Sequence, residues 1–460
     1  MDFPKPVMLQ IRIDVPKYVA EIAKALIQRG YQAYIVGGAV RDSLIGRTPT
    51  DWDISSSATP EEVKKVFGNA AIPTGERFGT LTILCGSRRV EVTTFRRESL
   101  YSDGRRPDRV VFSQNLRDDV ARRDFTVNAL AYDISQMTVT DYFGGMNDLK
   151  RTIIRTVGDP EERFNEDSLR MLRAIRFASE LGFGISPETL SGIAKLHSTI
   201  TRVSQERIRE ELSKMLLSPR PSEAVLHAHE TRLLKHILPE LSDCAHIPAY
   251  HESLDTVLEH SIKACQHIEP RLELRLAALL HDIGKPLTMA SDDTGRLRFF
   301  NHENVGAQMA EAALHRLKYP QALIEDITTL IKWHMFTYEP ATKDKGIRRL
   351  VNSLGLKTIY DLAKVRQADR IALGLDPSPG SNMEAFLQRL EDVLKQGPVF
   401  TVSNLAVDGH DVMKTLDIPE GPEVGKILLK LLDTVLEEPY LNSRGKLLEI
   451  IKTMDEDKIK

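Results

Sequence analysis

The sequence predicts an α+β protein in which an N-terminal region with a mixed sheet and helices precedes a predominantly α-helical body. Two observations carry this prediction. Short apolar runs with strand character, such as Ala33–Val36, occur before residue 150. Beyond Asp159 the apolar residues follow helical spacing instead, as in Ile427, Leu431 and Val435. The length of 460 residues accommodates several domains at roughly 100–200 residues each.

The first strand predicted before residue 50 ends at a pair of glycines. Ala33–Val36 runs into Gly37 and Gly38, where a backbone without Cβ atoms turns sharply and closely approaches a phosphate. A helix that begins near Ala39 would direct its first amides at that phosphate. An ordinary turn explains the glycines equally well when they are considered alone.

Two aspartates separated by one residue follow this turn. On an extended strand Asp51 and Asp53 face the same side, while Trp52 faces the other. Two adjacent carboxylates repel each other unless a cation neutralises them, and Mg²⁺ takes carboxylate oxygens together with substrate phosphates. Glu91, within a run of strand character, provides a third carboxylate for the same sheet. Taken separately, these acids would be ordinary surface charges.

Residues 118–133 combine basic and polar side chains with a predicted helical run whose apolar face contains Phe125, Ala129 and Leu130. Arginine forks onto a triphosphate, whereas aspartate and asparagine bind ribose hydroxyls. The polar residues in question are Arg122, Arg123, Asp124 and Asn128. The alternative interpretation is a salt-bridged helix start.

Four segments in order, GGAVRD, DWD, RRDFTVNA and EDSLRMLRAIRF, resemble the successive motifs of class II tRNA nucleotidyltransferases, the CCA-adding enzymes, and their bacterial poly(A) polymerase relatives. The resemblance implies a DNA polymerase β-like head in which Mg²⁺ binds Asp51 and Asp53, with Glu91 as the third carboxylate. It also implies nucleotide binding by Gly37, Gly38, Arg41, Arg123, Asp124 and Asn128.

The same resemblance assigns base selection to the protein itself, through Glu166, Asp167 and Arg170. An aspartate acceptor and an arginine donor one helical turn apart can meet the Watson–Crick edge of cytosine or adenine. Arg173 and Arg176 continue this face toward the triphosphate or the RNA. The segment ERIREELSKML, which contains Arg207, resembles the helix that braces the pocket. Without the neighbouring motifs, Glu166 and Arg170 would be read as a simple ion pair.

The implied reaction is template-independent addition of CCA to the 3′ end of tRNA from CTP and ATP, with release of pyrophosphate. The expected partner is therefore the tRNA acceptor arm. Residues 96–112, rich in Arg, Asp, Gly and Pro, are predicted to form a mobile loop. The resemblance equates this loop with the one present in enzymes that add the terminal A. An A-adding enzyme and a poly(A) polymerase remain alternatives.

A second group of candidate residues begins at LLHDIGKP and is spread over the following helices. The series resembles the HD phosphohydrolase superfamily, in which imidazoles and carboxylates hold a divalent transition metal that activates water. The implied ligands of one metal are His260, His281, Asp282 and Asp369. His302 and His334 are available for a second metal or for substrate phosphate, which Lys285 could also contact. The alternatives are an inactive scaffold, or a nucleotide or cyclic-phosphate hydrolase whose N-terminal half only binds RNA.

These assignments divide the chain into four regions. We expect a catalytic head at 1–150, a base-selecting neck at 151–240, an HD region at 241–380 and a helical tRNA-binding body at 381–460. The segment DPSPGSN (376–382) is the best linker candidate. The sequence does not specify an oligomeric state, because apolar helix faces serve equally as core or interface.

The overall composition constrains the surroundings of the protein. With 62 basic and 65 acidic residues the net charge is −3, so RNA must be bound by local basic patches, such as the pair Arg122-Arg123. Three widely separated cysteines argue against a disulfide framework. Neither a signal-type N-terminus nor a membrane span is predicted. We therefore expect a cytoplasmic protein without membrane contact.

Overall fold

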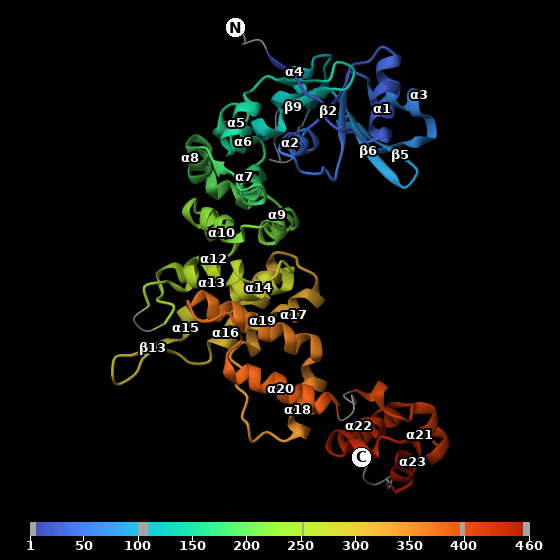
Figure 1. The fold of residues 1–460 in the computed structure, drawn as a ribbon, viewed down its shortest axis with the longest axis vertical. Helices are drawn as coiled ribbons and strands as arrows, with labels where there is room; N and C mark the ends of the chain where they lie inside the picture. Colours follow the sequence, from blue (N-terminus) through green and yellow to red (C-terminus); the bar gives the residue numbers. More distant parts are fainter. Residues whose placement is uncertain (1–5, 100–108, 251–252, 396–400, 454–460) are drawn as a thin grey trace. The chain divides into compact units, whose positions relative to one another are not determined.

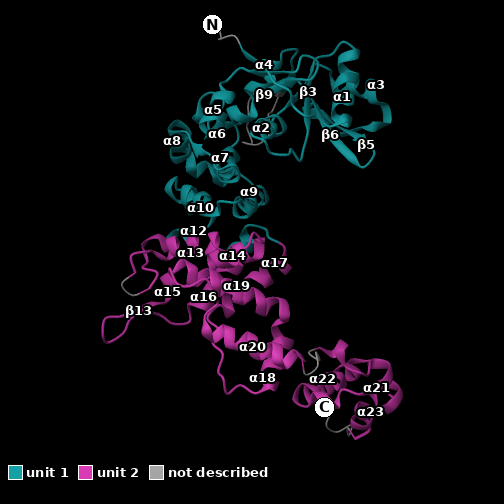
Figure 2. Ribbon diagram, in the orientation of Figure 1, with its two compact units in different colours: residues 1–243, 313–319 teal, residues 244–312, 320–460 magenta. Residues whose placement is uncertain are grey.

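The computed structural model describes residues 6–99, 109–250, 253–395 and 401–453 (Figure 1). The chain divides into two compact units (Figure 2). Unit 1 comprises Met1–Asp243 and Ala313–Tyr319, and unit 2 comprises Cys244–Ala312 and Pro320–Lys460.

Unit 1 begins with the predicted mixed sheet, whose eight strands lie in the order β1-β10-β9-β2-β3-β6-β5-β4. The strand pairs are antiparallel except for β3 and β6, which run parallel. The helices α1 (Lys17–Gln28), α2 (Gly38–Leu44) and α3 (Pro60–Phe67) contact the sheet. In chain order the strands are β1 (Val7–Gln10), β2 (Ala33–Val36), β3 (Asp53–Ser56), β4 (Ala71–Gly75), β5 (Thr80–Cys85), β6 (Arg88–Thr94), β9 (Leu130–Asp133) and β10 (Thr138–Asp141).

Alternation of side chains explains why β6 presents a carboxylate at the surface. Val90 and Val92 are buried, while Glu91 between them is exposed. Because successive side chains of a strand point to opposite faces, burial of the two valines fixes Glu91 on the opposite face. Strand β2 has the predicted bounds, and Ile35 and Val36 are buried in it.

The helical run predicted over residues 118–133 is wrong. The helix α4 (Leu116–Ala121) ends before Arg122, and a short 3₁₀ turn at Thr126–Asn128 precedes strand β9. Strand β9 pairs with both β2 and β10, so sheet hydrogen bonds outweigh the local helical pattern. Phe125, Ala129 and Leu130 are nevertheless fully buried, as their apolar character predicted.

The two ends of the predicted loop over residues 96–112 are strands. β7 (Arg96–Ser99) and β8 (Arg109–Phe112) form an antiparallel pair. The middle of the predicted loop, residues 100–108, lies outside the described residues.

The remainder of unit 1 is mainly helical. Two residues of β11 (Ile153–Ile154) pair with β12 (Gly184–Ile185). Helix α7 packs against α9 and α10. Asp159 caps α6 by accepting hydrogen bonds from the backbone amides of Glu161 and Glu162. The helices are α5 (Gly145–Arg151), α6 (Pro160–Glu166), α7 (Leu169–Leu181), α8 (Pro187–Leu196), α9 (Gln205–Leu217), α10 (Pro221–Glu230), α11 (Leu234–Ile237) and α12 (Pro239–Ser242).

Unit 2 is helical apart from a hairpin of β13 (Met289–Ser291) and β14 (Leu297–Phe299). Helix α13 packs against α14 and α19, and α20 shares a hydrophobic core with α18 and α19. Residues 376–382 join α19 to α20 inside this unit, and the predicted division after residue 380 stays a prediction. The helices are α13 (Val257–Gln266), α14 (Leu272–Leu280), α15 (Lys285–Thr288), α16 (His302–Arg316), α17 (Gln321–Trp333), α18 (Asp344–Leu354), α19 (Leu356–Ala372) and α20 (Ser381–Lys395).

The last three helices, α21 (Gly409–Leu416), α22 (Pro422–Glu437) and α23 (Arg444–Thr453), enclose a core of their own. Ile427, Leu431 and Val435 of α22 are fully buried there, as their helical spacing predicted. All three cysteines carry free thiols, as predicted. In the part of the chain that the structure describes, no helix has both the length and the apolar composition needed to cross a bilayer.

Candidate functional site

Three carboxylates meet at the junction of the two parallel strands. Asp53 opens β3 and lies in register with Glu91 of β6, so their side chains leave the sheet on the same face. Asp51 lies just before β3, with Trp52 buried between the two aspartates. The alternation expected for this segment therefore holds, although the strand itself begins only at Asp53.

The electrostatics of this cluster favour a bound cation. Burial, together with the nearby charges of Glu91 and Asp51, raises the pKa of Asp53 to about 6, although the positive charge of Arg123 opposes the shift. A carboxylate pushed toward protonation by like charges gains stability when a divalent cation neutralises the group. The donor set consists of oxygens only, which fits a hard metal ion.

A glycine turn faces the same carboxylates. Strand β2 ends at Val36, and Gly37 adopts a positive φ of 76°. A Cβ atom at Gly37 would lie only 2.9 Å from Nη1 of Arg123 and 3.9 Å from Oδ2 of Asp53. Glycine is therefore required both for the backbone conformation and for the close approach of Arg123.

The glycine turn, the carboxylates of Asp51 and Asp53, and several arginines line one cleft of about 920 Å³, whose lining does not include Glu91. Its walls come from the turn after β2, helix α2, the start of β3, the segment after α4, and helices α7 and α9. The predicted site residues in this lining are Gly37, Gly38, Arg41, Asp51, Asp53, Arg123, Asp124, Asn128, Arg173 and Arg176.

Asp124 and Asn128, predicted to bind ribose, are hydrogen-bonded to each other, and each also accepts hydrogen bonds from one arginine. Arg173 donates from Nε and Nη2 to Oδ2 of Asp124 at 2.9 and 2.6 Å, and Asn128 donates to Oδ1. Although burial opposes the change, Arg173 and Asn128 lower the pKa of Asp124 to about 2. Arg41 donates to Oδ1 of Asn128 at 2.6 Å. These side chains are thus fixed before any substrate binds.

A second cavity of about 230 Å³ adjoins these residues and is lined by Asp167 and Arg170. The two do not lie on one helical turn, because α6 ends at Glu166 and Asp167 adopts an extended conformation before α7. Arg170 forms an ion pair with Glu166 at 2.5 Å, as in the alternative interpretation of these two residues. Arg207 of α9 forks onto both carboxylate oxygens of Asp167 at 3.3 and 2.7 Å, which makes it the brace of this cavity.

Phe177 is a cleft residue that sequence reasoning missed. It lines the large cleft, directly after Arg176, and three guanidinium groups surround its ring. Arg176 is buried and is held by Glu211 and Glu180 at 2.6 and 2.7 Å. An aromatic residue that follows spaced arginines was the available signal, but its helical spacing reads as core.

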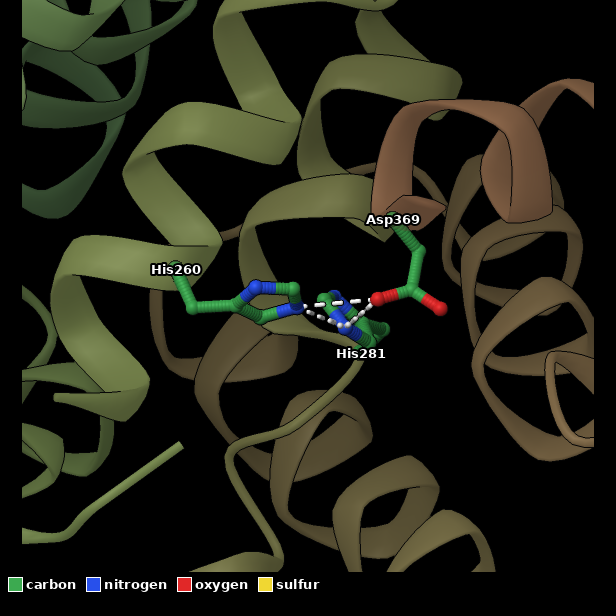
Figure 3. Close-up of side chains that lie close together, drawn as sticks. All are labelled: His260, His281 and Asp369. Carbon is green, nitrogen blue, oxygen red and sulfur yellow. Dashed lines mark hydrogen bonds and ion pairs between the residues drawn. The ribbon is translucent and has the colours of Figure 1, made fainter. Parts of the chain in front are cut away.

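In unit 2 the predicted histidines and aspartates converge, and Figure 3 shows three of them. Nε2 of His260 lies 2.9 Å from Oδ1 of Asp369 and 3.3 Å from Nε2 of His281. Their ligand atoms lie within 4.8 Å of one another, a spacing suited to one metal ion.

A second group of ligand atoms within the same limit comprises Asp282, His302 and His334. Oδ1 of Asp282 lies 3.3 Å from Nε2 of His302, while Oδ2 lies 3.2 Å from Nε2 of His281. The carboxylate of Asp282 thus faces both groups. The resemblance to HD phosphohydrolases assigns Asp282 to the first metal, and the geometry also places it beside the second ligand group.

Three of these imidazoles are oriented by the same local device. Nδ1 of each ring binds the carbonyl oxygen three residues earlier, at 2.9 Å for His281, 2.7 Å for His302 and 2.6 Å for His334. This contact leaves each Nε2 pointing at the ligand group. Burial and the neighbouring His281 lower the pKa of His334 to about 3, so this ring is neutral and able to bind metal.

The surrounding cavity of about 600 Å³ has an apolar rim that the sequence did not reveal. Tyr250, Phe299 and Phe300 contribute to it, and Phe300 is 77% exposed. Lys285, predicted to contact phosphate, places Nζ 2.6 Å from Oδ2 of Asp282.

The features of unit 1 define a class of protein, the nucleotidyltransferases. Carboxylates at the start of a strand and several arginines line one cleft there. Unit 2 adds a histidine–aspartate centre of the HD type. Residues 33–155 match the family described as the Poly A polymerase head domain, and residues 256–373 match the HD domain. Between them, residues 182–244 match a probable RNA and SrmB-binding site of polymerase A.

Full-length relatives narrow this class. The chain is 33% identical to the CCA-adding enzyme of Lactobacillus helveticus, over 94% of this chain and 96% of that protein. It is 34% identical to the CCA-adding enzyme of Lactobacillus johnsonii, over 94% of this chain and 95% of that protein. The crystal structure of the Bacillus stearothermophilus CCA-adding enzyme in complex with CTP superposes with a TM-score of 0.68 at 28% identity, covering 95% of this chain and 96% of that one.

The chain therefore belongs to the family of CCA-adding enzymes, which are tRNA nucleotidyltransferases. The matched head and HD domains imply that the protein depends on divalent metal ions.

Proposed function

We propose that this protein adds C, C and A in turn to the 3′ end of tRNA, using CTP and ATP and releasing pyrophosphate. The observation that carries the proposal is the register of Asp53 with Glu91 beside Asp51, at the edge of a cleft lined by arginines. The Bacillus stearothermophilus relative was crystallised with CTP.

In the proposed reaction the tRNA 3′-oxygen bonds to the α-phosphorus of the nucleotide while the bond from that phosphorus to the β-phosphate oxygen breaks. Mg²⁺, when bound by Asp51 and Asp53, would hold the triphosphate and stabilise the charge that develops on it. One of the clustered carboxylates accepts the proton of the hydroxyl. The arginines of the cleft bind the phosphates of the nucleotide, and pyrophosphate is the leaving group.

Base selection is assigned to the smaller cavity. Asp167 accepts and Arg170 donates, so together they can pair with the Watson–Crick edge of either base. Arg207 fixes the carboxylate of Asp167 from the side. Because these donors and acceptors belong to the protein, no nucleic-acid template is required. We further propose that the protein works in the cytoplasm, where tRNA is its partner.

The test uses transcripts of one tRNA that end before CCA, after C, or after CC. Each is incubated with the purified protein, Mg²⁺ and CTP, ATP or both, and the 3′ ends are sequenced. Completion of CCA on the shortest transcript supports the proposal. Addition of A to the CC-ended transcript alone would make the protein an A-adding enzyme, and long A tails on unrelated RNA would make it a poly(A) polymerase.

As a second activity we propose metal-dependent phosphoester hydrolysis in unit 2. The specific observation in favour is that two groups of three ligand residues adjoin at the carboxylate of Asp282. Hydrogen bonds to carbonyl oxygens orient Nε2 of three of the four imidazoles, those of His281, His302 and His334, toward these groups. Nitrogen-rich donors favour a divalent transition metal. Hydrolysis of bis(p-nitrophenyl) phosphate and p-nitrophenyl phosphate after loading with Mn²⁺, Co²⁺ or Ni²⁺ tests the proposal. A lack of turnover with all three metals would leave unit 2 as a scaffold.

A further inference from the structure

Phe177 occupies an unusual position for a buried phenylalanine. Its side chain belongs to α7, is 7% exposed and lines the large cleft of unit 1. The Cζ atoms of three arginines lie close to its ring centroid, at 5.1 Å for Arg41, 5.2 Å for Arg173 and 4.0 Å for Arg176. All three distances fall within the range of about 6 Å over which an aromatic face attracts a cation.

The three arginines come from two helices, since Arg173 and Arg176 share α7 with Phe177 and Arg41 belongs to α2. Arg41 lies in α2, just after the glycine turn, and donates to Asn128. Arg173 lies in α7 and holds Asp124. The ring also meets the edge of Phe125, with centroids 5.7 Å apart and an interplanar angle of 79°. Phe177 therefore touches the side chains that line the proposed nucleotide site from both the sheet side and the helical side.

Asp124 and Asn128 accept hydrogen bonds from the N–H groups at the edges of the guanidinium groups of Arg173 and Arg41. Such contacts alone leave the plane of each guanidinium group free to tilt. An aromatic face fixes the plane of a guanidinium group as well. It also offsets part of the repulsion among three cations, together with Asp124 and Glu211. An arginine that is already aligned loses less conformational freedom when it binds a phosphate.

We propose that Phe177 is a positioning residue for nucleotide binding, which holds Arg41 and Arg173 in the orientation that receives the triphosphate and ribose of CTP or ATP. This inference rests on the proposed nucleotidyl transfer. Loss of aligned donors weakens ground-state binding, so it appears mainly in KM.

The substitution Phe177→Leu removes the aromatic face but keeps the site apolar. We expect the KM for both CTP and ATP to rise about tenfold, with kcat changed less than about threefold. Phe177→Tyr keeps the face and should restore KM to within about twofold of the wild type. Phe177→Met, similar in length and without an aromatic face, gives the same test if the leucine variant does not fold.

The matched control is Phe164→Leu, which shortens a fully buried phenylalanine of α6 that is absent from the lining of both cavities. It should lower the melting temperature without raising KM. Calorimetric titration of CTP into each folded variant without tRNA measures binding separately from turnover. Unchanged KM and CTP affinity in Phe177→Leu, or a tyrosine variant as impaired as the leucine variant, would overturn the inference. A wild-type protein that adds no nucleotide would instead refute the proposed function.

Discussion

The two candidate sites bring their potential metal ligands together in different ways. In the cleft of unit 1, oxygen ligands stand at the start of a strand and on its parallel neighbour, where strand register alone brings Asp53 beside Glu91. In the pocket of unit 2, three of the four imidazoles lie at or next to helix ends and are turned inward by hydrogen bonds to carbonyl oxygens three residues earlier. Asp51 and Glu91 are exposed, whereas His260, His281 and Asp282 are buried.

This contrast predicts that the two sites bind different cations. A partly exposed cluster of oxygens beside arginines suits an ion that arrives with a triphosphate and leaves with the product. A buried cluster of imidazoles suits a transition metal that stays in place. The two sites should therefore respond independently to substitution and to metal, and the following predictions, in order of decreasing effect, test that independence.

The largest effect is expected from removing one metal-facing residue at each site. Asp51→Ala should lower nucleotide addition by about three orders of magnitude while leaving phosphoester hydrolysis unchanged, and His281→Ala should do the reverse. Both activities are measured on each folded variant. Asp293→Ala and His410→Ala, at exposed positions, serve as controls. Loss of both activities in either folded variant would show that the sites are coupled.

Metal removal should separate the sites by ligand chemistry. After treatment with a chelator and dialysis, Mg²⁺ alone should restore nucleotide addition, because its ligands are carboxylates. Hydrolysis in unit 2 should return only when Mn²⁺, Co²⁺ or Ni²⁺ is added, because four of its six candidate ligands are imidazoles. Rates are compared across a metal series at fixed pH. Equal recovery of both activities in Mg²⁺ would contradict the distinction.

Asp124→Asn should destabilise the protein by about 2 kcal/mol at pH 7, since the carboxylate is buried and its pKa is lowered to about 2. A carboxylate with a lowered pKa contributes this stability when the pH is above its pKa in the unfolded state, which is about 4. The contribution is lost as the pH falls toward the folded-state pKa of about 2. The difference in free energy of unfolding between wild type and variant should therefore shrink from pH 6 to pH 3. Urea titrations at both pH values measure it, and a pH-independent difference would argue against this origin.

The smallest effect is expected from Arg207, which holds the carboxylate of Asp167 in the smaller cavity of unit 1. Arg207→Lys keeps the charge but removes the fork onto Asp167, so kcat/KM for CTP and ATP should fall about tenfold. Arg202→Lys, at an exposed position nearby, is the control. Rates with each nucleotide on the appropriate tRNA end give the comparison. Unchanged rates would mean that Asp167 holds its position without Arg207.

Local sequence patterns anticipated much of the fold around the cleft. The strand at Ala33–Val36, the glycine turn and the position of Glu91 on a neighbouring strand followed from apolar alternation and from the conformational needs of glycine. The pattern over residues 118–133 misled, because spacing cannot separate a short buried strand from a helix when tertiary pairing decides the outcome. The same limit hid the break between Glu166 and Leu169.

By itself, the sequence determined the chemical types at both sites and the order in which they occur along the chain, since carboxylates, arginines and imidazoles have distinct affinities for metals and phosphates. Only the tertiary structure decided which of them meet. Arg207 reaches Asp167 across 40 residues, Asp282 faces two ligand groups at once, and Arg41 of α2 reaches the ring of Phe177 in α7. The physical reason is that such contacts depend on how helices and strands pack, which no local spacing encodes.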